Sequence, residues 1–186
     1  MSNTSQNIFL IGPMGSGKTT IGKQLAKILG LDFYDCDQEL EHLTGASVNL
    51  IFDVEGETGF RSRESRLLDT LSAKNGVLIA TGGGVVCNKE NRRMLCSRGF
   101  VVYLKTSIEK QLRRLSQDKS RPLLQAQDRT QRLLDLARTR NPLYDATADL
   151  VFNTRNSSVY ASAKALSNAI TKQVEPLKPE TPDANS

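Results

Sequence analysis

A glycine-rich segment near the N-terminus constrains the fold of this 186-residue chain more than any other feature. Residues 12–19 read GPMGSGKT and fit the pattern G-x-x-x-x-G-K-[ST]. The run before it, residues 7–11, is apolar and β-branched, and the residues after it have the apolar spacing of a helix. A strand, a glycine-rich loop and a helix in this order predict a loop that wraps a phosphate group.

The loop residues have the chemistry that a nucleoside triphosphate needs. Glycines let backbone N–H groups turn inward around a phosphate, and the positive end of the following helix adds to the attraction. Lys18 is expected to reach the β- and γ-phosphates, and the Thr19 hydroxyl to ligate Mg²⁺. The residues expected to bind ATP in this segment are Gly12, Gly15, Ser16, Gly17, Lys18, Thr19 and Thr20.

Short apolar runs alternate with amphipathic stretches along the whole chain. The runs with strand composition are residues 7–11, 32–35, 76–80, 100–104 and 149–153. Nearly apolar strands separated by helices predict an α/β three-layer sandwich with a central parallel sheet. Ligands in such folds bind beyond the carboxyl ends of the strands. The face of the first helix is predicted from Ile21, Leu25, Ile28 and Leu29, and its end from Gly30.

Two carboxylates follow the second run, Asp35 and Asp37. In extended backbone, residues two apart project from the same face, so both carboxylates are expected in one cleft. One could hold Mg²⁺ through water, and the other could accept a proton from a substrate hydroxyl. An equally weighted alternative is that Asp37 only caps a helix that begins at residue 38.

Further anion-binding groups follow the third run. Three consecutive glycines, residues 82–84, can bring their N–H groups close to an anionic ligand, although a plain flexible connection is the alternative. Arginine binds carboxylates and phosphates through two parallel hydrogen bonds. The arginines that stand out are Arg61, Arg114, Arg121 and Arg140. Prolines at 122 and 142 predict helix ends beside the last two.

The net charge of +5 is local, because residues 105–140 contain ten basic and four acidic residues. That segment has no aromatic residue to stack on bases, which argues against a nucleic-acid groove. The three cysteines show no metal-ligand spacing, and no apolar run approaches the roughly 20 residues that span a bilayer. We therefore expect a cytoplasmic protein without nucleic-acid or membrane partners.

Taken together, the motifs closely resemble the shikimate kinase family over about residues 8–171. They are GPMGSGKTTIG, FYDCD, the TG…IF…GE..FR..E stretch at 44–64, ATGGG, VVYL, RPLL and RNPLY. The family transfers the γ-phosphoryl group of ATP to the 3-hydroxyl of shikimate, a cyclic polyol with a carboxylate, in aromatic amino-acid biosynthesis. The resemblance implies a P-loop kinase with a five-stranded parallel sheet and a mobile lid.

The resemblance also implies a division of the chain and a role for each motif residue. It implies one kinase domain over residues 1–174, with a substrate-binding segment at about 36–64 and a lid at about 116–127, acting as a monomer. Residues 175–186 are rich in proline and poor in apolar residues, which predicts a disordered tail. The implied catalytic residues are Asp37, Lys18 and Arg121, and Asp35 would join Thr19 at Mg²⁺. ATP would also contact Arg114, Arg121 and Arg155. The implied shikimate contacts are Asp37, Phe52, Phe60, Arg61, Gly82, Gly83, Gly84 and Arg140, with Glu64 orienting Arg61.

Two rival functions are weighed against this one. Another P-loop kinase of small metabolites, such as a gluconate-type kinase, shares most of the chemistry. A non-catalytic nucleotide switch is suggested by residues 53–56, which fit D-x-x-G. The apolar spacing around Asp53 instead predicts a helix there, and residues 88–91 lack the acid of the guanine-reading motif NKxD.

Overall fold

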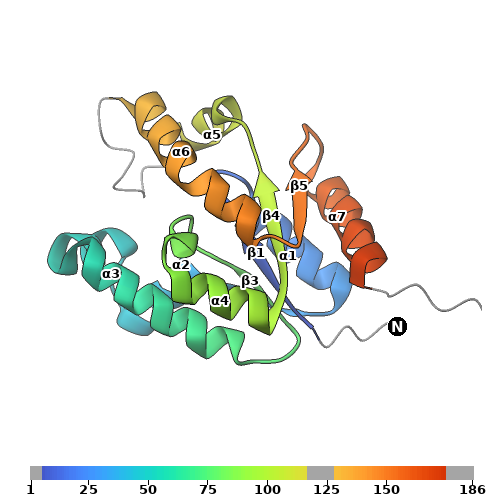
Figure 1. The fold of residues 1–186 in the computed structure, drawn as a ribbon, viewed down its shortest axis with the longest axis horizontal. Coiled ribbons are helices and arrows are strands. Elements are labelled where there is room, and N and C mark those ends of the chain that lie inside the picture. Colours follow the sequence, from blue (N-terminus) through green and yellow to red (C-terminus); the bar gives the residue numbers. More distant parts are fainter. Residues whose placement is uncertain (1–5, 117–127, 175–186) are drawn as a thin grey trace, which may run out of the picture.

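A five-stranded, all-parallel sheet forms the centre of the computed structural model, which describes residues 6–116 and 128–174. The strand order is β2-β3-β1-β4-β5. Figure 1 labels β1, β3, β4 and β5 among the surrounding helices. The strands are β1 (Asn7–Ile11), β2 (Asp32–Asp35), β3 (Val77–Ala80), β4 (Gly99–Lys105) and β5 (Leu150–Asn153). The predicted α/β sandwich is confirmed, and each predicted strand is found with ends that agree within one residue.

Helices connect the strands and cover both faces of the sheet. They are α1 (Lys18–Leu29), α2 (Cys36–Thr44), α3 (Val48–Ser72), the 3₁₀ turn η1 (Val85–Cys87), α4 (Lys89–Arg98), α5 (Ile108–Leu115), α6 (Arg129–Thr147) and α7 (Val159–Val174). Within the described ranges, none of them combines the length and apolar character needed to cross a membrane.

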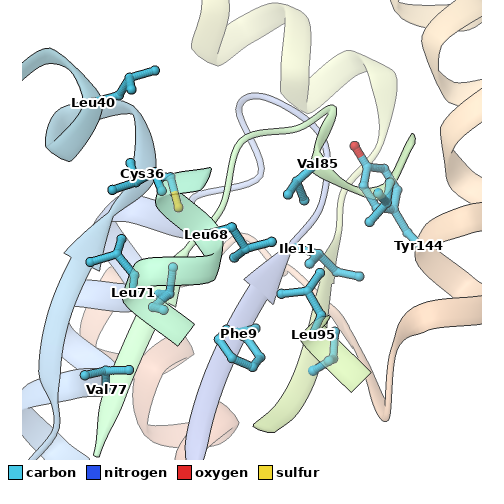
Figure 2. Packing of buried hydrophobic residues seen from close by; sticks show 14 of the residues in the cluster. Phe9, Ile11, Cys36, Leu40, Leu68, Leu71, Val77, Val85, Leu95 and Tyr144 are labelled. Carbon is cyan, nitrogen blue, oxygen red and sulfur yellow. The ribbon is translucent and has the colours of Figure 1, made fainter. Parts of the chain in front are cut away.

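The alternation of side chains along β1 divides the core into two layers. Ile8 and Leu10 face the layer that contains α1 and α7, whereas Phe9 and Ile11 face the layer that contains α3, α4 and α6. Figure 2 shows Phe9 and Ile11 within the second layer, with Tyr144 of α6 at its end near Val85. The sheet is buried on both faces, as its continuous apolar runs predict.

The predicted face of α1 is correct for three of its four residues. Ile21 and Leu25 are buried and Leu29 is half-buried, but Ile28 is 38% exposed, so the prediction for Ile28 is wrong. Gly22 packs against Leu10, Phe33 and Leu78 of the sheet. The buried face of α1 therefore runs through Gly22, Leu25 and Ala26, and Ile28 lies beside that face. The helix ends at Gly30 in the left-handed conformation, as predicted.

The prediction of a helix end at Pro142 is also wrong, because α6 continues through this proline to Thr147. A proline inside a helix removes one hydrogen bond and distorts the preceding turn. Buried Tyr144 and Thr147, which follow Pro142 in the same helix, hold this part of α6 in the core. Arg140 therefore lies within a helix and not at a loop edge.

Gly99 provides a test of how closely β4 packs on β1. It pairs with Asn7, and a methyl group at this position would collide with the Asn7 carbonyl oxygen and lie 2.7 Å from the Phe9 ring. Since backbone cannot move aside without disturbing strand pairing, we expect Gly99→Ala to lower the free energy of unfolding by about 1–3 kcal/mol in urea denaturation. The exposed Ser97→Ala is the control, with an expected change within about 0.5 kcal/mol. Wild-type stability of the Gly99 variant would contradict this packing.

Candidate active site

Two neighbouring cavities open beyond the carboxyl ends of the central strands. The first, called here the loop cavity, has a volume of about 180 Å³ and is lined by Gly15, Gly17, Lys18, Thr19, Thr20, Asp35, Asp37, Thr81, Gly82, Gly83, Arg114 and Leu115. The second, the arginine cavity, has a volume of about 280 Å³ and is lined by Met14, Thr19, Asp35, Asp37, Gln38, Glu41, Val48, Phe52, Phe60, Arg61, Glu64, Gly82, Gly83, Gly84 and Arg140.

The two cavities meet along a shared wall. The residues that line both are Thr19, Asp35, Asp37, Gly82 and Gly83. A ligand in one cavity would therefore meet a ligand in the other beside the two predicted carboxylates. This is the arrangement that a direct transfer of a group between two substrates requires.

The loop cavity has the backbone of an anion site. Gly12, Gly15 and Gly17 have φ values of 145°, 77° and 91°, a region that residues with a side chain rarely adopt. The loop leads directly into α1, so the positive end of the helix dipole faces the cavity. The sequence pattern and the backbone conformation agree on a phosphate site.

Two cationic side chains lie against the loop. Lys18 Nζ donates to the carbonyl oxygens of Gly12 and Pro13 at 2.8 and 2.9 Å. Arg114 of α5 donates from Nη1 to the Gly15 carbonyl at 2.7 Å. The predicted ATP contacts Lys18 and Arg114 are thus brought to the same cavity from different parts of the chain.

Asp35 joins the loop to the second strand. Its Oδ2 accepts from Thr19 Oγ1 at 2.5 Å, and its Oδ1 accepts from the Gln38 N–H at 3.1 Å, which caps α2. The residue that caps this helix is therefore Asp35, and the alternative in which Asp37 is the cap is wrong. Strand β2 ends at Asp35, so Asp37 does not extend along the strand as expected. It reaches the shared wall from the first turn of α2.

The pair of Thr19 and Asp35 fits a hydrated Mg²⁺ ion. Both side chains present oxygen atoms, the ligands that Mg²⁺ prefers. No cluster of three or more His, Cys, Asp or Glu residues that could hold a metal ion is found among the described residues. Mg²⁺ commonly takes one or two protein ligands and completes its shell with water and substrate phosphates.

Arg61 and the aromatic rings of α3 form one side of the arginine cavity. Arg61 Nη1 bonds Glu64 Oε1 at 2.8 Å, and its guanidinium lies 5.2 Å from the centre of the Phe60 ring. Phe60 stacks on Phe52 with ring centres 4.4 Å apart. Burial alone would lower the pKa of Arg61, but the carboxylates of Glu64 and Glu57 raise it. The Arg61 guanidinium therefore keeps its positive charge, and it lies beside the apolar wall that Phe52 and Phe60 form.

The glycine segment passes between the guanidiniums of Arg61 and Arg140. A Cβ at Gly84 would lie 2.5 Å from the guanidinium carbon of Arg61, and one at Gly83 would lie 3.5 Å from Nη1 of Arg140. Arg140 itself is 8% exposed. The guanidiniums of Arg61 and Arg140 thus lie beside glycine backbone that no side chain covers. This arrangement suits a carboxylate ligand.

Glu64 is a buried carboxylate with one oxygen committed to Arg61. It is 3% exposed, and its Oε2 has no hydrogen-bond partner among the described residues. A Cβ at Gly82 would lie 2.5 Å from that oxygen, so a side chain at this position would have to displace the Glu64 carboxylate. Burial raises the pKa of Glu64, although the Arg61 guanidinium opposes this shift. Glu64 was expected to orient Arg61, and the 2.8 Å bond supports that expectation.

Some predicted site residues lie elsewhere. Arg155, between β5 and α7, is exposed and lines neither cavity. Arg121, nearly all of the lid at 116–127, and the tail at 175–186 lie outside the described residues. The sequence analysis missed the lining residues Met14, Gln38, Glu41, Val48, Thr81 and Leu115. Helical spacing could have found Glu41, which lies one turn after Asp37.

The family comparison settles which group of proteins has this arrangement. The shikimate kinase family model matches residues 14–173. This chain belongs to the shikimate kinase family. The resemblance inferred from the motifs is confirmed, and so is the P-loop kinase fold.

Individual relatives agree along almost their whole length. A shikimate kinase of Histophilus somni is 51% identical over 93% of this chain and 97% of its own. Shikimate kinase 1 of Erwinia tasmaniensis is 52% identical over 91% of this chain and 96% of its own. The solved structure of Acinetobacter baumannii shikimate kinase in complex with shikimate is 44% identical, covers 95% of this chain and 97% of its own, and superposes with a TM-score of 0.91.

The raised pKa of Glu64 gives a prediction for stability against pH. The folded protein keeps this proton to a higher pH than the unfolded chain, whose Glu has a pKa of 4.5. The contribution of Glu64 to the free energy of unfolding therefore falls as pH rises above 4.5. Glutamine does not titrate, so the free energy of unfolding of Glu64→Gln minus that of wild type should increase with pH.

This difference is measurable by urea denaturation between about pH 4.5 and about pH 7.5. Glu57→Gln, which removes the largely exposed carboxylate beside Arg61, is the control for loss of a charge next to that guanidinium. A difference for Glu64→Gln that stays flat or falls with pH would show that burial does not govern this carboxyl.

Proposed function

We propose that this chain is a shikimate kinase, which transfers the γ-phosphoryl group of ATP to the 3-hydroxyl of shikimate and releases shikimate 3-phosphate and ADP. The observation that carries the proposal is the shared wall, where Asp37 lies between a phosphate-binding cavity and a cavity built for a carboxylate. Shikimate has a carboxylate at one end of its ring and hydroxyls at the other, which matches the polarity of the arginine cavity.

In this proposal the arginine cavity fixes the acceptor. Arg61, Arg140 and the N–H groups of Gly83 and Gly84 bind the carboxylate, because a guanidinium and a planar carboxylate pair through two hydrogen bonds. The rings of Phe52 and Phe60 pack against the apolar side of the shikimate ring. Residues 36–64, which include α2 and the first part of α3, thus act as the substrate-binding segment.

Asp37 is the proposed base. Its carboxylate accepts the proton of the 3-hydroxyl as that oxygen attacks the γ-phosphorus and the bond to the β-phosphate oxygen breaks. Phosphoryl transfer demands little covalent help from a protein, so positioning and charge neutralisation supply most of the rate. Lys18 and, by the family resemblance, Arg121 balance the charge on the transferring group.

Mg²⁺ is the proposed cofactor, held by Thr19 and, through water, by Asp35. When bound with ATP it would neutralise the negative charge that develops during phosphoryl transfer. The hydrogen bond between Thr19 and Asp35 supports this role, because it places two oxygen ligands side by side at the edge of the loop cavity. By the family resemblance, Arg114 and Arg155 would bind the adenine side of ATP.

The domain extent, the oligomeric state, the location and the partners of the protein are also proposals. We propose one kinase domain over residues 1–174, acting as a cytoplasmic monomer without nucleic-acid or membrane partners. Asp53, the acid that suggested a nucleotide switch, is exposed on α3 and lines neither cavity, which argues against that rival.

A substrate panel tests the proposed function. Purified protein with ATP and Mg²⁺ should release ADP with shikimate, as followed by a coupled NADH assay, and mass spectrometry should detect a phosphorylated acceptor. Gluconate and nucleoside monophosphates are the competing acceptors, because the nearest rivals use them. Turnover of either of these without turnover of shikimate would refute the proposal.

The role of Asp37 is tested by replacing its carboxylate with an amide of equal size. Asp37→Asn should lower kcat by at least about 10²-fold, the lower end of what general base catalysis contributes. Its affinity for ATP, measured by calorimetry, should stay within about threefold of wild type, a change of under 1 kcal/mol. Asp53→Asn, on the exposed face of α3, is the matched control. A variant with near-normal kcat would remove Asp37 from the mechanism.

A further inference from the structure

Tyr144 is a buried residue of α6 that the proposed mechanism does not use. It follows Arg140 by one helical turn and is fully buried. Its hydroxyl donates to the Gly83 carbonyl oxygen at 2.5 Å, across 61 residues of sequence. The same glycine lies beside Arg140, whose Nη1 would be 3.5 Å from a Cβ at Gly83.

The ring of Tyr144 is held in place independently of its hydrogen bond to Gly83. It packs on Tyr103 of β4, with ring centres 5.0 Å apart, and lies at the end of the core next to Val85 (Figure 2). Burial raises the pKa of Tyr144 well above its usual value, so the hydroxyl keeps its proton. Because the ring is fixed and the hydroxyl always carries its proton, the Gly83 carbonyl that accepts from it is held in one position.

The acceptor of this hydrogen bond belongs to the arginine cavity. Arg140 and Gly83 line it, and Gly84 continues from Gly83 along the same wall. In a planar trans peptide, the C=O and the following N–H point in opposite directions. Holding the Gly83 carbonyl toward Tyr144 therefore also sets the direction of the Gly84 N–H.

A buried tyrosine often serves only to fill the core and satisfy one acceptor. That explanation takes no account of where the bond ends, which is the peptide between Gly83 and Gly84, beside Arg140 in the arginine cavity. We infer that Tyr144 is a positioning residue, whose hydroxyl holds the Gly83–Gly84 peptide in the geometry that binds, together with Arg140, the carboxylate of the acceptor substrate. The inference rests on the proposed function, because the acceptor it concerns is shikimate.

Tyr144→Phe removes the hydroxyl and keeps the ring. The KM for shikimate should rise about threefold to tenfold, the size expected for losing one hydrogen bond between neutral groups. The KM for ATP and kcat should each change less than about twofold, since a tyrosine outside the loop cavity affects ground-state binding of one substrate. Tyr103→Phe is the matched control, because Tyr103 is equally buried and packs on the same ring, whereas the bond to Gly83 comes from the Tyr144 hydroxyl. It should leave all three constants unchanged.

These measurements separate a positioning role from a structural one. If both variants lose thermal stability alike while only Tyr144→Phe raises the KM for shikimate, the inference stands. An unchanged KM for shikimate in Tyr144→Phe, or equal losses for shikimate and ATP, would overturn it.

A second readout does not depend on the substrate. The amide ¹⁵N chemical shift of Gly84 should move in Tyr144→Phe, because the hydrogen bond to the preceding carbonyl is lost, and it should stay in place in Tyr103→Phe. An unmoved Gly84 resonance would overturn the inference whatever the enzyme phosphorylates. Wild type could fail to phosphorylate shikimate while the Gly84 resonance still moves in Tyr144→Phe. In that case the proposed function fails, and the role of the Tyr144 hydroxyl in holding the Gly83–Gly84 peptide stands.

Discussion

The hydrogen bond between Thr19 and Asp35 is the contact on which the geometry of the site depends. It links the helix after the phosphate loop to the end of β2, and the same carboxylate caps α2. The first turn of α2 carries Asp37, so the position of the proposed base follows from the cap. The same aspartate lines both the loop cavity and the arginine cavity, and in the proposed function a hydrated metal ion would bind beside it.

The charges around that junction are fixed by pairing and burial. Arg61 and Glu64 lie on one helix at a spacing of three residues, which brings their side chains together. Arg140 approaches from α6, beyond the glycine segment. Burying cations costs free energy unless partners are supplied, and Glu64 supplies one to Arg61. The cavity therefore holds the Arg61 guanidinium in place before a carboxylate arrives.

Short sequence patterns correctly predicted the strands and the phosphate loop, because the structure of these segments depends mainly on neighbouring residues in the chain. The strands at 7–11 and 32–35 are found with their predicted ends, because continuous apolar runs bounded by polar residues allow little choice. The phosphate loop followed from spacing alone. The helix through Pro142 and the outward turn of Ile28 were mispredicted, because packing against the sheet outweighed the local signal. The meeting of Gly83 with Tyr144 depends on two distant segments and has no signature in either one.

The excess of positive charge gains a partial explanation from the same geometry. Two members of the basic segment at 105–140, Arg114 and Arg140, face the two cavities, although they lie on different helices. Both proposed substrates are anions, one a polyphosphate and the other a carboxylate. Cations around a cleft raise the local concentration of such ligands, and at physiological salt the effect extends over about 8 Å. A segment that would suit a polynucleotide by its charge alone therefore suits two small anions better, because its charge is presented at cavities of their size.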